Sequence, residues 1–186
     1  MDFLKKNWSN LILLLVIIIL ILPQTRRPLQ VAMNRIFAFA PREIADQDRE
    51  EVVSYDWKLA SLEGEPVNFQ EARGKVAVVN LWATWCPPCI AEMPSFQEVF
   101  ASYGNRVAFY FVSDEQHQTL KDFLRRKGYR LPVYRPLEPP PASFDSDRLP
   151  TTYVISAEGE IVIRKTGAAD WNDTEFRATL DRLLGI

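Results

Sequence analysis

The chain has 186 residues, 47% hydrophobic and 12% aromatic, which is enough for one substantial core and an appendage. Its formal net charge of −2 and its single histidine, His117, provide no basic field and argue against a nucleic-acid partner. We therefore expect one globular domain that does not act on nucleic acid.

The N-terminal part of the chain is the most apolar. An uninterrupted run of Leu, Ile and Val extends over 11–22 without the polar stripe of a helix that packs on a globular core. Its length also suits a cleavable signal, but the best cleavage motif, Ala38–Ala40, is followed by Pro41, which disfavours cleavage. We interpret residues 1–24 as a signal-anchor transmembrane segment that contacts membrane lipid through residues 8–22.

Residues 25–51 are interpreted as a juxtamembrane linker. Residues 29–40 are apolar with two polar interruptions, which suits either a short helix on the membrane surface or a plain linker. Residues 41–51 are charged and have the composition of a spacer. The pattern changes at residue 52, and we expect one folded domain over 52–186.

The domain shows alternating strand and helix patterns. Runs of β-branched residues predict strands that are buried on both faces, and apolar residues three and four apart predict amphipathic helices. Glu-Gly-Glu occurs at 63–65 and again at 158–160, where it predicts hairpin turns. The expected elements are strands over 55–62, 66–69, 76–82 and 107–112, helices over 86–103 and 116–127, strands over 152–156 and 161–166, and a helix over 173–184.

Both cysteines lie in the motif WCPPC, as Cys86 and Cys89. A structural disulfide across two residues would close almost no chain, and structural zinc wants four ligands, whereas this chain adds one histidine to two cysteines. At a helix start, this spacing brings the two sulfurs within bonding reach and leaves the first facing solvent. The motif therefore predicts redox chemistry, with Cys86 as the nucleophile and Cys89 as the thiol that resolves a mixed disulfide.

Three stretches carry a family resemblance. VVNLWATWCPPCIAEMPSF, the preceding GEPVNFQEARGK and the later LPTTYVISAEGEIV together resemble the membrane-anchored TlpA/ResA-like thiol–disulfide oxidoreductases, over residues 55–186. The resemblance implies an α/β, thioredoxin-like fold: a central mixed sheet flanked by helices, with an N-terminal β-hairpin extension. In this chain an N-terminal transmembrane helix is expected to precede that domain.

The resemblance also implies an activity. Such proteins are tethered to the bacterial inner (cytoplasmic) membrane by a single span, with the catalytic domain on the outer, periplasmic side. There they reduce disulfides of exported proteins, for example in cytochrome c maturation, and a membrane thiol protein returns the electrons. The redox-active disulfide Cys86–Cys89 replaces a cofactor, and no metal is expected. A thiol oxidase or isomerase of the same fold and a copper-binding metallochaperone module are the alternatives.

The resemblance places a docking surface opposite the cysteines. Pro150 corresponds to a cis-proline that faces the CxxC motif, and the backbone of Leu149 beside it is expected to pair with an extended client peptide. Thr151 completes this element, and Trp85 is expected at the rim of the surface. Between Tyr134 and Arg148 the prolines of RPLEPPPASFDSD, including those within 136–141, replace a short helix found in relatives and predict an extended, exposed path.

Proton transfer needs a separate assignment. Asn80 stands where many thioredoxins carry a buried carboxylate, and asparagine cannot titrate. Asp114 and Glu115, which follow the second core strand, are the candidate proton relay, because relatives place an acidic residue there. Ser113 and Gln116 have the spacing of a capping box. Glu92 is interpreted as structural.

Overall fold

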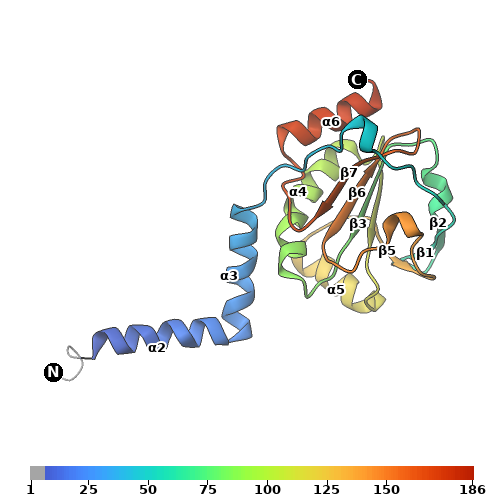
Figure 1. Ribbon diagram of the computed structural model, residues 1–186. Coiled ribbons are helices and arrows are strands. Elements are labelled where there is room, and N and C mark those ends of the chain that lie inside the picture. Colours follow the sequence, from blue (N-terminus) through green and yellow to red (C-terminus); the bar gives the residue numbers. More distant parts are fainter. Residues whose placement is uncertain (1–6) are drawn as a thin grey trace.

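The structure, a computed structural model, describes residues 7–186, without the side chains of 19–21 and 23. Its described part contains a seven-stranded sheet and helices, with α3 beside α4 and α2 extending away from the sheet domain (Figure 1). The strands are β1 (Lys58–Ser61), β2 (Pro66–Asn68), β3 (Ala77–Leu81), β4 (Ala108–Val112), β5 (Val133–Pro136), β6 (Thr151–Ile155) and β7 (Ile161–Thr166). The helices are α2 (Trp8–Ile21), α3 (Pro23–Ile36), α4 (Pro87–Tyr103), α5 (His117–Lys127) and α6 (Thr174–Leu184), with 3-10 turns η1 (Asp46–Asp48), η2 (Phe69–Ala72) and η3 (Ala142–Phe144).

The sheet is mixed and has the order β2-β1-β5-β4-β3-β6-β7. Strand β4 is parallel to both β3 and β5, whereas the other neighbours are antiparallel. The β1–β2 hairpin extends one side of the sheet, as the sequence predicted. Because β3 and β4 are parallel, their carboxyl ends share one edge, and the chain enters α4 from that edge.

Two apolar cores lie on the two faces of the sheet, since successive strand residues point to opposite sides. One core packs under α4, α5 and α6, and it contains Val78, Met93, Phe96, Phe111, Leu120, Trp171 and Phe176. The other contains Tyr55, Trp57, Phe69, Val79, Phe144 and Tyr153, and it is covered by η2, η3 and the chain before β1. Both faces are thus buried, which explains the continuous apolar runs in the sequence.

The proline-rich segment departs from the prediction. Its first part forms β5, which pairs with β1 and β4 rather than staying free of the sheet. Beyond β5, Leu137 N–H donates to the Lys58 carbonyl at 2.9 Å, and the Trp57 indole N–H donates to the Glu138 carbonyl at 3.2 Å. Phe144 in η3 is fully buried, so the segment is extended but docked, because it supplies apolar contacts to the second core.

Two local predictions were wrong. The first strand begins at Lys58 instead of 55, because the Trp57 N–H bonds to the carbonyl of Tyr55 in a tight turn. The N-cap of α5 is Gln116, which makes no side-chain capping bond, so the predicted capping box is absent. Ser113 instead bonds to Glu115, at 3.3 Å from hydroxyl to carboxylate.

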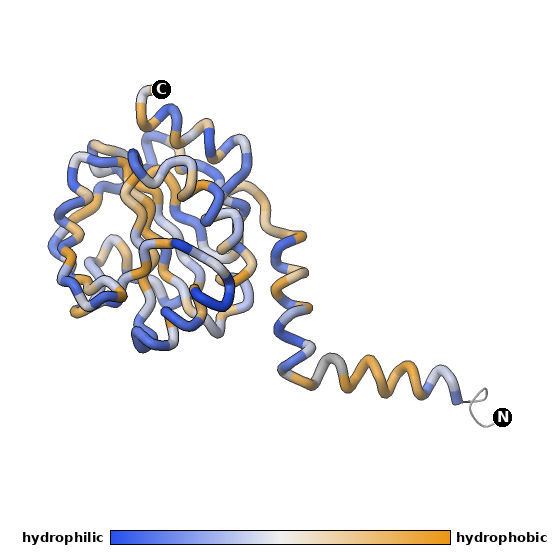
Figure 2. Tube along the Cα trace, turned by 180° about the vertical axis from the view of Figure 1, so that it is seen from behind, coloured by the Kyte–Doolittle hydropathy of each residue, from blue (hydrophilic) through white to orange (hydrophobic). Residues whose placement is uncertain are grey.

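Helix α2 lies outside the sheet domain. Figure 2 shows α2 as an apolar helix pointing away from the domain, and the side chains of 11–18 are exposed. None of the helices in the described part of the chain is both long and apolar enough to cross a membrane. The predicted transmembrane helix within 1–24 is therefore not confirmed, and residues 1–6 of it lie outside the described residues.

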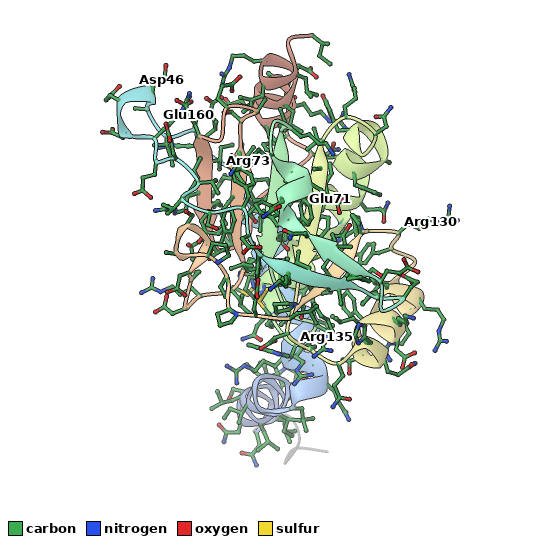
Figure 3. All side chains as sticks on the ribbon, turned by 90° about the vertical axis from the view of Figure 1, so that its right-hand side faces the viewer. Asp46, Glu71, Arg73, Arg130, Arg135 and Glu160 are labelled. Atoms are coloured by element: carbon green, nitrogen blue, oxygen red, sulfur yellow. A yellow bond between two sulfur atoms is a disulfide. The ribbon has the colours of Figure 1, made fainter. Side chains whose placement is uncertain are left out.

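The segment that was predicted to be a linker is attached to the domain. Helix α3 contacts α4, and the Ile44 N–H donates to the carbonyl of Val162 in β7 at 2.8 Å. Arg49 pairs with Asp46 at 2.6 Å and with Glu160 at 3.3 Å, and these two acidic residues lie at the same end of the domain in Figure 3. Residues 41–51 are thus held against β7 and do not form a free spacer.

Candidate functional site

The two cysteines lie where β3 leads into α4. Cys86 is the N-cap of α4, and its sulfur accepts a hydrogen bond from the Cys89 N–H at 3.3 Å. The two residues form a disulfide with their Cα atoms 5.3 Å apart. Cys86 is 3% exposed and Cys89 is fully buried, so Cys86 is the less buried of the two cysteines. Cys86 caps the helix and Cys89 lies further in, as predicted, but Cys86 is also buried, so the prediction that its sulfur faces solvent is not confirmed.

The two prolines between the cysteines shape this helix start. Pro87 and Pro88 occupy the first helical positions, where the backbone N–H would have no partner within the helix. Because proline has no N–H, the first donor that reaches the Cys86 sulfur is that of Cys89. The helix N-terminus also places positive partial charge beside this sulfur, which favours a thiolate there after reduction.

The loop before β6 lies at the same sheet edge as the cysteines. The Leu149–Pro150 peptide bond is cis, as predicted, and the Pro150 carbonyl accepts from Gly167 N–H at 2.9 Å. Thr151, the first residue of β6, pairs with Leu81, the last residue of β3, so this loop and the CxxC helix start share one edge.

Trp85 and Thr151 differ in exposure. Trp85 is 59% exposed directly before Cys86, in agreement with its predicted position at the rim. Thr151 is 1% exposed, and its hydroxyl bonds to the Arg148 carbonyl at 2.8 Å and to the Ser146 hydroxyl at 2.9 Å. Thr151 therefore holds the loop in place, whereas Trp85 is free to contact a client protein.

The two predicted relay residues occupy different environments. The Glu115 carboxylate accepts from Thr84 N–H at 2.6 Å and from the Thr84 hydroxyl at 2.7 Å, so it is attached to the loop that leads to Cys86. Asp114 is exposed and lines a cavity of about 340 Å³ together with Trp82 and Leu149. Glu115 therefore lies beside the loop that leads to Cys86, whereas the neighbouring Asp114 is exposed to solvent.

Glu92 is the titratable group that the sequence analysis did not place in the site. It is 1% exposed, and its carboxylate accepts from Asn80 Nδ2 and from the Trp171 indole N–H, both at 2.9 Å. Burial raises the pKa of Glu92 to about 8, in spite of these hydrogen bonds. Asn80 also donates to the Thr152 hydroxyl at 2.8 Å, so the asparagine links Glu92 to β6. The interpretation of Glu92 as a merely structural residue is therefore incomplete.

The sequence contains a pattern that indicates a role for Glu92 near the cysteines. Cys89, Met93 and Phe96 are buried on the side of α4 that faces the sheet, and Glu92 lies three residues after Cys89 on the same side. A carboxylate within an apolar helix face is costly unless it is hydrogen-bonded or protonated. Such a residue one turn from a redox cysteine is a candidate for proton exchange.

His117, the single histidine, is bonded on both ring nitrogens. Its Nε2 lies 3.1 Å from the carbonyl oxygen of Ser61, and its Nδ1 lies 3.3 Å from Nη1 of Arg135. It is the first residue of α5, and these contacts tie that helix to the β1–β2 hairpin and β5. Both ring nitrogens of His117 therefore have hydrogen-bond partners within the domain.

A Cys-x-x-Cys pair at a helix start, facing a cis-proline beside a mixed sheet, defines a thioredoxin-like protein with a redox-active disulfide. The chain belongs to the AhpC/TSA family, whose model matches residues 53–164. It is 32% identical over 174 residues to the thiol–disulfide oxidoreductase ResA of Halalkalibacterium halodurans, which covers 90% of each chain. It is also 26% identical over 152 residues to the thioredoxin-like protein YneN of Bacillus subtilis, covering 80% of this chain and 88% of that one.

The solved structures show the same fold. A Chlorobium tepidum protein described as a thiol:disulfide interchange protein DsbE superposes with a TM-score of 0.63 at 20% identity, covering 74% of this chain and 99% of the other. At this identity the likeness supports the fold alone. The relatives support the activity, and the solved structure supports the fold. The protein is therefore a thiol–disulfide oxidoreductase with a thioredoxin-like fold.

Proposed function

We propose that this enzyme reduces disulfides of exported proteins, for example during cytochrome c maturation, through the Cys86–Cys89 dithiol. The observation that carries the proposal is the pair of prolines between the cysteines at the start of α4. They add no positive charge beside Cys86, whereas a histidine there would stabilise the thiolate and make the disulfide more oxidising. A relative named thiol–disulfide oxidoreductase ResA, which aligns over 90% of the chain, supports thiol–disulfide exchange as the reaction.

The reaction transfers two electrons from the dithiol to the client. The Cys86 thiolate attacks a client disulfide, forms a mixed disulfide and releases one client sulfur as a thiolate, which takes up a proton. Cys89 then loses its proton and attacks the Cys86 sulfur, and the second client thiolate leaves. The Cys86–Cys89 disulfide that remains is reduced again by a membrane thiol protein, which we propose as the electron donor.

We propose that a client docks beside the loop before β6. Trp85 offers an exposed aromatic surface, and the backbone at Leu149 and Pro150 lies at the same sheet edge as Cys86. An extended peptide is bound there by main-chain hydrogen bonds, while the ring of Trp85 excludes water from the exchanging sulfurs. Thr151 acts by keeping that loop in place.

We propose that three carboxylates handle the proton of Cys89. Glu92 is buried one turn from Cys89 and has a pKa raised to about 8, so it exchanges a proton near neutral pH. Glu115 is half-buried beside Thr84, and Asp114 is exposed, so these two form the side of the relay that communicates with solvent. No cofactor besides the cysteine pair is part of the proposal.

The reduction potential of the Cys86–Cys89 pair tests the direction of electron flow. We expect a value close to about −270 mV, near that of thioredoxin, when the full chain is equilibrated with glutathione or dithiothreitol buffers and the thiols are counted. A value near about −120 mV would show that the enzyme is an oxidant. Activity in reshuffling a scrambled disulfide protein without net reduction would instead favour an isomerase.

We also propose that residues 8–22 attach the enzyme to the bacterial inner membrane, with the catalytic domain on its outer side. The exposed Leu, Ile and Val side chains of α2 support this proposal, because such a surface is unfavourable in water. A reporter that is active only outside the cytoplasm, fused after Ile186, is expected to be active and to sediment with membranes. Replacing Leu14 and Ile17 with aspartate is the matched variant and should release the fusion. A reporter that is inactive outside would contradict the orientation.

A further inference from the structure

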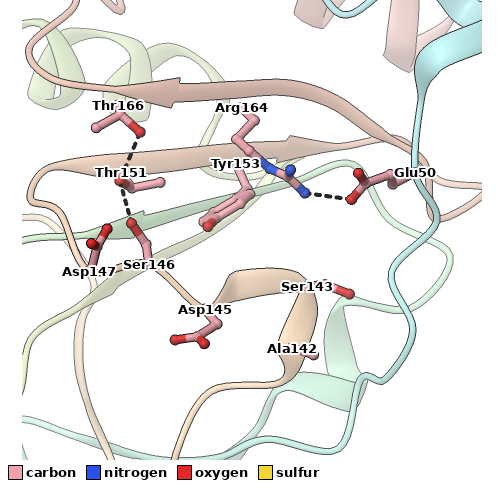
Figure 4. A pocket seen from close by; sticks show the side chains of 10 residues that line it. All are labelled: Glu50, Ala142, Ser143, Asp145, Ser146, Asp147, Thr151, Tyr153, Arg164 and Thr166. Carbon is pink, nitrogen blue, oxygen red and sulfur yellow. Dashed lines mark hydrogen bonds and ion pairs between the residues drawn. The ribbon is translucent and has the colours of Figure 1, made fainter.

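A second cavity lies on the sheet face away from α4 and has a volume of about 490 Å³. Six of the residues that line it form what we call the acidic pocket (Figure 4): Asp145, Ser146, Asp147, Thr151, Tyr153 and Arg164. Asp145, Ser146 and Asp147 belong to the loop between η3 and β6, Thr151 and Tyr153 to β6, and Arg164 to β7. None of these side chains takes part in the exchange chemistry described above.

The acidic pocket has more negative than positive charge. Its arginine, Arg164, is already paired with Glu50 at 2.7 Å. Asp147 has only Arg148 nearby, at 3.9 Å and with both side chains highly exposed, a geometry that contributes little. Asp145 makes no side-chain hydrogen bond or ion pair with any residue in 7–186. Two carboxylates are therefore available to a cation from outside the chain.

Tyr153 is an independent sign that this cavity receives a ligand. Its side chain is 2% exposed, yet its hydroxyl has no hydrogen-bond partner within the described residues. In Figure 4 the hydroxyl end of the ring points into the space between Ser146 and Asp145. Burial raises the pKa of Tyr153, so the hydroxyl stays protonated and serves as both donor and acceptor. The hydroxyl is not among the buried unpaired polar atoms of residues 7–186, so it opens onto the cavity, where it can donate to or accept from a ligand.

The acidic pocket is continuous with the docking surface. Ser146 and Asp147 line both this cavity and the one of about 340 Å³ that reaches Trp82, Asp114 and Leu149. Leu149 precedes the cis-proline that faces Cys86. A client that is held by its cysteine at Cys86 and follows this loop therefore passes from one cavity to the other, and Asp114 adds a further carboxylate along the way.

We infer that the acidic pocket binds a lysine or arginine side chain of the client polypeptide, close in sequence to the cysteine that Cys86 attacks. The inference rests on the proposed reductase function and adds a specificity for basic clients to it. An ammonium or guanidinium group donates to the carboxylates of Asp145 and Asp147 and to the Tyr153 hydroxyl.

Peptide disulfides provide the test with the full reduced chain. Each peptide contains one intramolecular disulfide and either lysine or glutamine, placed in turn at successive positions on both sides of the cysteines. At the best position and low ionic strength we expect kcat/KM to be about tenfold higher for the lysine peptide, and this preference to shrink at high salt. The double variant Asp145→Asn/Asp147→Asn should reduce the preference to less than about twofold and leave kcat/KM for the glutamine peptide unchanged.

Two further variants test the contribution of the Tyr153 hydroxyl and the effect of a negative charge outside the pocket. Tyr153→Phe keeps the ring and removes the hydroxyl, and it should lower the lysine preference without changing the glutamine rate. Glu158→Gln also removes one negative charge, but it lies in the β6–β7 turn at the opposite end of the sheet, and it should keep the full preference. A wild-type enzyme without lysine preference at any position, or a preference that survives in the double variant, would overturn the inference. Failure of the wild type to reduce either peptide would contradict the proposed function itself, and the inference with it.

Discussion

Replacing Cys89 with serine is expected to leave client proteins covalently attached to Cys86. The mixed disulfide is expected at Cys86 because this is the less buried cysteine and because, as the N-cap of α4, it lies where the helix N-terminus stabilises a thiolate. Serine retains the size of Cys89 but cannot attack a disulfide at neutral pH, and the chain has no third cysteine to take its place. Turnover should fall by about three orders of magnitude or more, as expected when a catalytic nucleophile is removed. Trapped species are detected as reductant-sensitive bands and identified by mass spectrometry.

Cys86→Ser is the matched control for this trapping. It removes the attacking sulfur and keeps the buried Cys89, so no client should accumulate. The identity of the client trapped by Cys89→Ser would show directly whether apocytochromes or other exported proteins are reduced. Equal trapping by both variants, or trapping through Cys89, would show that the assignment of the two roles is wrong.

Replacing Glu92 with glutamine is expected to abolish a large pH dependence of stability. The pKa of Glu92 is raised from 4.5 to about 8 in the folded chain, because the carboxyl is buried. Between these values the folded chain keeps a proton that the unfolded chain has lost, so the free energy of unfolding falls as pH rises. The slope is at most about 1.4 kcal/mol for each pH unit, which amounts to a few kcal/mol over the window. Above about pH 8 the folded chain has lost this proton as well, so Glu92 lowers the free energy of unfolding no further.

Urea unfolding of the oxidised enzyme measures this effect. We expect Glu92→Gln and the wild type to have similar stability near pH 4.5, where Glu92 is neutral, and the variant to be more stable by a few kcal/mol near pH 9. The pH profile of client reduction should lose a step near pH 8 in the same variant, a change that a purely structural role would not produce. Glu63→Gln, which alters an exposed carboxylate in the β1–β2 turn, serves as the control. Parallel stability curves for Glu92→Gln and the wild type would contradict the assignment.

The sequence alone predicted the parts whose structure follows from local physics. The apolar runs that became β3, β4 and β6 were found because strands buried on both faces require continuous β-branched and aromatic residues. The redox pair was found because two cysteines separated by two residues at a helix start allow few other uses. The cis bond at Pro150 was expected from the motif around it and is present in the structure.

The tertiary structure decided whatever depends on contacts between distant segments. Strand β5 and the docking of residues 41–51 on β7 have weak local signals, because their hydrogen bonds come from β1 and β7. Glu92 could be assigned to the site only when Asn80 and Trp171, which are distant in the chain, were seen to surround it. The acidic pocket likewise brings together the loop between η3 and Pro150 and strands β6 and β7. Burial and charge at such places are properties of the assembled chain, because neighbours from other segments, and not adjacent residues, determine the solvation of each group.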